Sequence, residues 1–168
     1  IVVERLFHQG SDVKAGDPGR ALVIGGFTKE NARAHIDFIL EIGNRGKRSI
    51  AVDIKSDTGR EYFGRLLATA DVFLTNLLPD SRERMGIDLE QVRARNPKII
   101  YARGHGYGTK GDLAAQGGFD LAAYWSRGGI ADAYSAGDGS YPPIQRPAFG
   151  DSYGGLCIAA GIAGALLK

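Results

Sequence analysis

The residues best suited to covalent chemistry lie near the carboxyl end, in the segment Gly150-Asp151-Ser152-Tyr153-Gly154. This segment matches G-x-S-x-G, the pattern with which a serine hydrolase presents its nucleophile on a sharp turn between a strand and a helix. Such an enzyme needs an acid and a histidine later in the chain, and residues 155–168 contain no His, Asp or Glu. A serine hydrolase that uses Ser152 therefore stays open only if segments outside this sequence supply the partners.

Asp151 is a second candidate nucleophile. A carboxylate at the start of a helix lies among unpaired backbone N–H groups, which stabilise an anion. Gly150, Gly154 and Gly155 have no side chains, so they leave space around this carboxylate for a bulky partner. Aspartate is also a common helix N-cap, and the pattern alone leaves both the cap and the nucleophile open.

Two other segments contain groups that could bind phosphate. Arg45, Lys47 and Arg48 lie close together on a predicted turn, where their charges suit a phosphate or pyrophosphate. A solvated basic turn would show the same pattern. The segment Gly106-Tyr107-Gly108-Thr109-Lys110-Gly111 matches G-x-G-x-x-G after a predicted strand. It does not belong to the first strand and helix, so a tightly turned loop is the preferred interpretation.

Three nearby features are assigned structural roles. An isolated histidine is more often structural than catalytic, which is the interpretation given to His105. The pairs Phe119-Asp120 and Tyr124-Trp125 are interpreted as packing residues, with Trp125 as the apolar anchor of a helix over 119–127.

Alternating strands and helices must position these residues. Apolar residues alternate along 49–54, as in a strand, whereas Tyr62, Phe63, Leu66, Leu67 and Ala70 share one face of a helix that Ser56 or Asp57 would cap. This order predicts an α/β fold: a Rossmann-like parallel sheet with helices on both faces, which binds ligands beyond the carboxyl ends of its strands. The predicted strands are 49–54, 72–74 (covered on both faces) and 98–102. The predicted helices are 29–42 (capped by Thr28, with 38–42 equally compatible with a strand), 56–70, 81–96 (broken at Gly86), 119–127 and 150–167.

Composition excludes several classes of protein. Of the 168 residues, 43% are hydrophobic and 24% charged, which is typical of a soluble globular protein. The net charge of +2 is too small for a nucleic-acid binder. The apolar run 156–167 is too short to span a bilayer, so no membrane association is expected. Cys157 is the single cysteine; it is expected to be buried, and a reducing cytoplasm is the expected setting.

Both ends of the sequence look cut. The chain opens on the strand-like Ile1-Val2-Val3 without a methionine, and it stops at Lys168 directly after an apolar helix that has no stop signal. We therefore expect one nucleotide-binding domain over residues 1–168, truncated at both ends.

Taken together, several segments resemble the family III CoA-transferases, the group that includes the formyl-CoA and carnitine-CoA transferases. Their order and spacing agree with the family from about residue 44 to the end, and residues 1–5 resemble its V-I-K-V-E strand. The matching segments are 44–53 (N-R-G-K-R-S-x-x-L-D), 70–76 (A-D-V-x-x-x-N), 84–86 (R-x-G), 96–101 (N-P-x-x-I-Y) and the Gly150-Asp151 element that carries the family's nucleophile.

The resemblance implies that this is an enzyme that moves CoA from an acyl-CoA donor to a carboxylic acid acceptor. Asp151 would pass through mixed anhydrides and an aspartyl-CoA thioester, and backbone N–H groups of 152–155 would stabilise the oxyanions. CoA is then a substrate and no metal is required. The family's second, smaller domain would be absent, and the full-length protein would form an interlocked homodimer. Positions that resemble CoA contacts are Arg5, Lys47, Arg48, Asn76, Leu77 and Arg84.

One departure from a related group bears on the reaction. The α-methylacyl-CoA racemases of the same superfamily carry a G-H-D histidine as a second acid or base, and this chain has Gly118-Phe119-Asp120 there. Because phenylalanine cannot transfer a proton, the departure weighs against a racemase. The racemase, the serine hydrolase and a non-catalytic nucleotide-binding module remain the alternatives.

Overall fold

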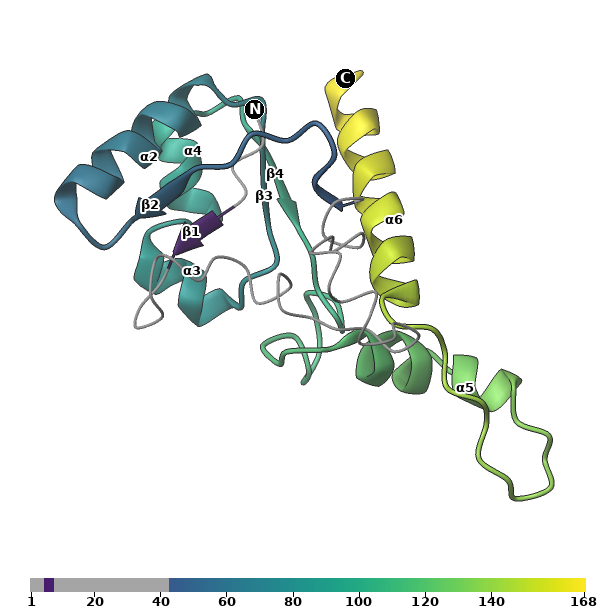
Figure 1. Ribbon diagram of the computed structural model, residues 1–168. Helices are drawn as coiled ribbons and strands as arrows, with labels where there is room; N and C mark the ends of the chain where they lie inside the picture. Colours follow the sequence, from purple (N-terminus) through teal and green to yellow (C-terminus); the bar gives the residue numbers. More distant parts are fainter. Residues whose placement is uncertain (1–4, 8–42) are drawn as a thin grey trace, which may run out of the picture. The chain divides into compact units, whose positions relative to one another are not determined.

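The computed structural model describes residues 5–7, by their backbone alone, and residues 43–168. The predicted helix over 29–42 and its cap Thr28 lie outside these residues. The chain divides into two compact units, Ile1–Leu66 and Leu67–Lys168, and Figure 1 shows their elements coloured along the sequence. The elements are β1 (Arg5–Phe7), β2 (Ala51–Asp53), α2 (Asp57–Thr69), β3 (Val72–Thr75), α3 (Pro79–Met85), α4 (Leu89–Arg95), β4 (Ile100–Arg103), the π-helix η3 (Leu121–Arg127), α5 (Ile130–Ala133) and α6 (Phe149–Leu166).

The described strands pair in parallel. In the first unit β1 pairs with β2, with Arg5 opposite Ala51. In the second unit β3 pairs with β4, and Phe73 lies opposite Tyr101, with ring centroids 5.3 Å apart. Parallel strands need a crossover between them, and the helices α3 and α4 supply it between β3 and β4. The α/β fold class that the sequence predicts is confirmed.

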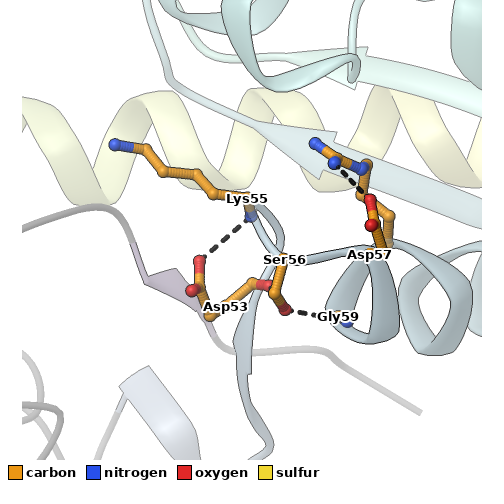
Figure 2. Close-up of polar contacts among 6 residues, drawn as sticks. Asp53, Lys55, Ser56, Asp57 and Gly59 are labelled. Carbon is orange, nitrogen blue, oxygen red and sulfur yellow. Dashed lines mark hydrogen bonds and ion pairs between the residues drawn. The ribbon is translucent and has the colours of Figure 1, made fainter.

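Side chains of the first unit fix the turn from β2 into α2 (Figure 2). Ser56 caps the helix as predicted, because its Oγ accepts a hydrogen bond from the Gly59 N–H at 3.0 Å. The same hydroxyl donates to the carbonyl oxygen of Asp53 at 2.8 Å, and the Asp53 carboxylate accepts from the Lys55 N–H at 3.0 Å. This hydroxyl therefore ties the end of β2 to the first turn of α2.

Burial along α2 and β3 departs from two predictions. Phe63 and Leu67 are almost fully buried, but Tyr62 exposes 52% of its surface. One helical position turns a side chain by about 100°, which carries Tyr62 out of the buried stripe. Leu74 is 55% exposed, so the prediction that this strand is covered on both faces is wrong at Leu74 within the part of the chain described.

The predicted break at Gly86 is confirmed, and it separates α3 from α4. Gly86 ends α3 with a φ of 67°, a left-handed conformation that glycine adopts without steric penalty. Its N–H donates to the carbonyl oxygen of Glu83 at 3.0 Å. Asp88 then caps α4 by accepting a hydrogen bond from the Gln91 N–H at 3.0 Å, and this bond is the largest of the causes that lower the pKa of its carboxyl. Between the two caps Ile87 is completely buried.

Asn96 joins two elements that are distant in sequence, and its loss should destabilise the protein. Its Nδ2 donates to the carbonyl oxygens of Leu67 and Ala70 at 2.9 and 2.8 Å. Asn96→Ala is therefore expected to lower the free energy of unfolding by about 1–3 kcal/mol, measured by urea denaturation of the full-length protein. The exposed neighbour Arg95 provides the control, because Arg95→Ala should change stability by less than about 0.5 kcal/mol. Equal effects of the two substitutions would contradict this role.

The last helix, α6, presents an uncovered apolar surface in the described structure. Leu156 is 67% exposed and Cys157 is exposed too, so the predicted burial of the cysteine is wrong. Among the described elements, β4 and η3 pack against α6, and Leu156 and Cys157 stay exposed. None of the helices among the described residues is both long and apolar enough to cross a membrane.

Candidate active site

Asp151 lies in the first turn of α6 and does not cap it. The residue before the helix is Ala148, which has a left-handed conformation with φ 61° and makes no capping hydrogen bond with its side chain. Asp151 is the third helical residue, and its carboxylate forms no hydrogen bond or ion pair with any described residue. The interpretation of Asp151 as a structural cap is therefore wrong.

The start of α6 is held by η3 through Gly150. The Gly150 N–H donates to Oδ1 of Asp120 at 3.0 Å. Gly150 is buried, and a β-carbon added to it would overlap Asp120 Oδ1 and the Cβ and Cγ atoms of Tyr124. Gly150 thus permits a close approach of two helices. The prediction that it leaves space around the Asp151 carboxylate is wrong. Gly154 and Gly155 do have open space around them among the described residues.

Aromatic rings surround this contact. The Tyr124 ring centroid lies 6.0 Å from that of Phe149 and 6.2 Å from that of Tyr153. Trp125 packs on Tyr134 at 5.8 Å. The predicted packing role of Tyr124 and Trp125 is confirmed, but that of Phe119 is wrong, because its side chain is 87% exposed. The rings on either side of Asp151 in the sequence both meet Tyr124.

The surroundings of Asp151 favour its neutral form. Partial burial of the carboxyl raises its pKa above the ordinary aspartate value of 3.8, and the negative charge of Asp120 raises it further. The residue as a whole is nevertheless exposed to solvent. A carboxylate with a raised pKa is more basic once ionised, and it is therefore a stronger nucleophile.

Ser152 is engaged with the backbone of its own helix. Its Oγ donates to the carbonyl oxygen of Ala148 at 2.7 Å, and its N–H donates to the same oxygen at 2.9 Å. No described histidine or carboxylate bonds to this hydroxyl, so the structure does not assemble a serine triad from the described residues. The predicted oxyanion role fails for the Ser152 N–H because that group is already bonded, and the N–H groups of 153–155 lie inside a helix that pairs them internally.

Three predicted CoA contacts belong to the first unit. Arg5 pairs with Ala51 in the parallel strands β1 and β2. Lys47 closes a turn in which its N–H donates to the Asn44 carbonyl oxygen at 3.0 Å and its Nζ donates to Asn44 Oδ1 at 3.2 Å. Lys47 and Arg48 are both exposed. The basic turn is confirmed as a structure, and phosphate binding there stays a prediction.

The other three predicted contacts belong to the second unit, at and after the carboxyl end of β3. Asn76 is exposed, and a β-carbon on Gly104 would lie 3.5 Å from Asn76 Cβ and 3.6 Å from Ile158 Cδ1 of α6. This places the strand ends against the helix that carries Asp151. Leu77 is half-buried, and Arg84 is exposed and donates to Ser81 Oγ at 3.0 Å. The structure shows no direct contact between these residues and Asp151.

Sequence reasoning missed two residues near the site. Asp120 was interpreted as a packing residue, yet its carboxylate holds the turn that carries Asp151. Arg82 is buried, and its Nη1 donates to the Leu77 carbonyl oxygen at 2.8 Å, which fixes the segment after β3. Asp120 could have been noticed because it matches the aspartate of the G-H-D segment of the racemases, although it lies thirty residues before Gly150. No signal marked the second, because charged helix residues are usually exposed.

No group of three or more His, Cys, Asp or Glu side chains that could hold a metal occurs in the described part of the chain.

His105, also predicted to be structural, has a buried Nε2 without a hydrogen-bond partner among the described residues. Burial first, and then the charges of Arg82 and Arg103, lower the pKa of its imidazole. The described fold and site thus define an α/β protein with an aspartate, Asp151, in the first turn of a helix that packs against β4 and η3.

Comparison with known proteins identifies the family. Residues 12–168 match the model of CoA-transferase family III. The chain therefore belongs to CoA-transferase family III, a family of enzymes.

Individual relatives include both transferases and a racemase. The chain is 37% identical to (R)-2-hydroxy-4-methylpentanoate CoA-transferase of Clostridioides difficile over 146 residues, which cover 87% of this chain and 36% of that protein. It is 35% identical to α-methylacyl-CoA racemase of Mus musculus over 125 residues, covering 74% and 32%. The crystal structure of a CAIB/BAIF family protein from Brucella suis has a TM-score of 0.67 and 36% identity, covering 74% and 32%. The chain thus spans about a third of the length of these relatives.

Proposed function

We propose that the protein is a CoA-transferase in which this chain supplies part of the CoA-binding fold and the nucleophile Asp151. The observation that carries the proposal is the state of the two candidate nucleophiles in the first turn of α6. The Asp151 carboxylate forms no hydrogen bond with the described residues, whereas the Ser152 hydroxyl donates to the backbone at 2.7 Å. Similarity to proteins named CoA-transferases supports it.

The proposed reaction proceeds by covalent exchange at Asp151. The carboxylate attacks the thioester carbonyl of the donor, the C–S bond breaks, and a mixed anhydride and CoA thiolate form. The thiolate then attacks the aspartyl carbonyl and releases the donor acid, leaving a thioester between Asp151 and CoA. The acceptor carboxylate repeats both steps in reverse and leaves as its CoA ester. Covalent catalysis of this kind divides one difficult exchange into easier steps and conserves the thioester.

The CoA contacts are part of this proposal. Charge-assisted hydrogen bonds from the exposed cations Lys47 and Arg48 suit the phosphates of CoA. Arg5, Asn76, Leu77 and Arg84 occupy positions that resemble CoA contacts of the family. A cytoplasmic, interlocked homodimer of the full-length protein completes the proposal, with the second domain supplied by the rest of the protein.

One observation favours transferase over racemase chemistry. Phe119 occupies the position of the racemase histidine and exposes 87% of its surface, so no side chain at this position can exchange a proton. Incubation of the full-length protein with a 2-methylacyl-CoA in heavy water tests this directly. A transferase leaves the α-proton in place, and deuterium at the α-carbon by mass spectrometry would favour the racemase.

The decisive experiment traps the thioester. The full-length protein is incubated with acyl-CoA without an acceptor acid, digested under mildly acidic conditions and analysed by mass spectrometry. We expect the mass of CoA, linked as a thioester, on the peptide that contains residue 151, with fragment ions placing it on Asp151. An acyl group on Ser152 would identify a hydrolase, and an unmodified peptide would indicate binding without catalysis.

A further inference from the structure

We propose that Asp120 is a positioning residue for the nucleophile: it fixes the first turn of α6 through Gly150 and places a second negative charge beside Asp151. This inference rests on the proposed function, because it presumes that the Asp151 carboxylate attacks the thioester. Asp120 itself is not proposed to touch the substrate.

The positioning part follows from the contact between Asp120 and Gly150. Asp120 directly precedes η3, and its Oδ1 accepts the Gly150 N–H at 3.0 Å. Gly150 adjoins Asp151 in the chain, so this bond restrains the backbone that carries the nucleophile. A carboxylate oxygen forms a stronger bond to an N–H group than a neutral acceptor does. The lack of space for a β-carbon at Gly150 shows how closely the two helices meet there.

The electrostatic part follows from the second oxygen of the same carboxylate. Asp120 Oδ2 is buried and has no hydrogen-bond partner among the described residues. Its charge is therefore only partly neutralised by the bond that Oδ1 accepts, and this charge acts on the Asp151 carboxyl. Repulsion from the Asp120 charge makes the Asp151 carboxyl harder to ionise.

The other ionisable groups near this turn do not offset the repulsion. Among the described elements, η3 and β4 pack against α6. The ionisable groups there are Tyr124 and Arg127 of η3, Asp120 directly before η3, and Tyr101 and Arg103 of β4. Burial raises the pKa of the Asp151 carboxyl most, and of these groups it is Asp120 whose charge raises this pKa further. Asp120 therefore makes the ionised nucleophile more basic and speeds its attack on a thioester carbonyl.

Asp120→Asn separates the two effects, because asparagine retains an oxygen that can accept the Gly150 N–H but loses the charge. In the full-length protein we expect the acidic limb of the pH profile of kcat/KM to move to lower pH. The plateau value of kcat should fall roughly 3- to 10-fold as the nucleophile becomes less basic, while the KM for acyl-CoA and the melting temperature stay near those of the wild type.

Asp120→Ala removes the hydrogen bond as well as the charge. It should lower kcat further than Asp120→Asn does, and it should also lower the melting temperature. Asp120→Asn should therefore keep the stability of the wild type but not its pH profile. Asp132→Asn is the matched control, because it removes one exposed carboxylate from the neighbouring helix α5. The pH profile of this control should coincide with that of the wild type.

Two results would overturn the proposal: a pH profile of Asp120→Asn that coincides with that of the wild type, or kinetics of Asp120→Asn that coincide with those of Asp120→Ala. Failure of the proposed function has a different signature, since Asp151→Asn would then retain CoA transfer. If Asp151→Asn is inactive and Asp120→Asn behaves as the wild type, the transferase stands and only the role of Asp120 is lost.

Discussion

Asp151→Asn in the full-length protein should lower the rate of CoA transfer by at least about 10³-fold. The amide has nearly the same shape as the carboxylate but cannot form the anhydride. Because Asp151 makes no hydrogen bond with the described residues, CoA binding and the fold should persist. CoA affinity is measured by calorimetry and transfer by chromatography of the two acyl-CoA esters.

Stability supplies an independent check on Asp151→Asn. The pKa of Asp151 is raised above 3.8 in the folded protein, which means that folding favours the neutral carboxyl. The resulting stabilisation is fully present below pH 3.8 and is lost as the pH rises through the raised pKa. A permanently neutral asparagine should therefore leave the melting temperature at neutral pH unchanged or slightly higher. A large fall would mean that the inactive variant is simply misfolded.

Ser152→Ala is the matched control at the adjacent position. Among the described residues the Ser152 hydroxyl bonds to the Ala148 carbonyl oxygen alone, so transfer should stay within a few-fold of the wild type. The transferase proposal would be abandoned if Ser152→Ala were inactive while Asp151→Asn retained full activity.

Gly150→Ala should have the second largest effect. The added methyl group overlaps Asp120 and Tyr124, and one of them must move. Overpacking of this kind lowers the free energy of unfolding by about 1–3 kcal/mol. Displacement of the turn by about 1 Å would lower the transfer rate about 100-fold. Chemical denaturation and the transfer assay measure the two effects.

Gly161→Ala tests whether the effect belongs to position 150. Gly161 lies in the same helix and has no atom of the described chain within 4 Å of an added β-carbon. Alanine there should raise the stability by about 0.5–1 kcal/mol, because glycine is a poor helix former, and transfer should be unchanged. Equal losses of stability and transfer rate in both variants would show that alanine disturbs α6 at either position. The contact with Asp120 would then not account for the effect of Gly150→Ala.

The elements that local signals define were predictable from the sequence. The Ser56 cap and the break at Gly86 each depend on a side chain and the few backbone groups beside it. The exposure of Leu74 was not predictable in this way, because it depends on which distant segments pack on the strand. Local hydrogen bonding is encoded nearby in the sequence, whereas burial is a property of the assembled chain.

The candidate site shows the same division. The chemistry of Asp151 could be proposed from its neighbours, but its position within the helix could not, because α6 begins after Ala148 in a left-handed conformation that alanine rarely adopts. The role of Asp120 depends on a contact across thirty residues. A pattern of neighbouring residue types does not reveal such a contact.

The bond between Gly150 and Asp120 also separates the framework of the site from its reactivity. The backbone N–H of Gly150 fixes the position of residue 151, so the side chain of residue 151 is not needed to hold the helix in place. A thiol or a longer acid could replace the carboxylate without rebuilding the surrounding helices. Such a position can acquire a new reaction through a single substitution.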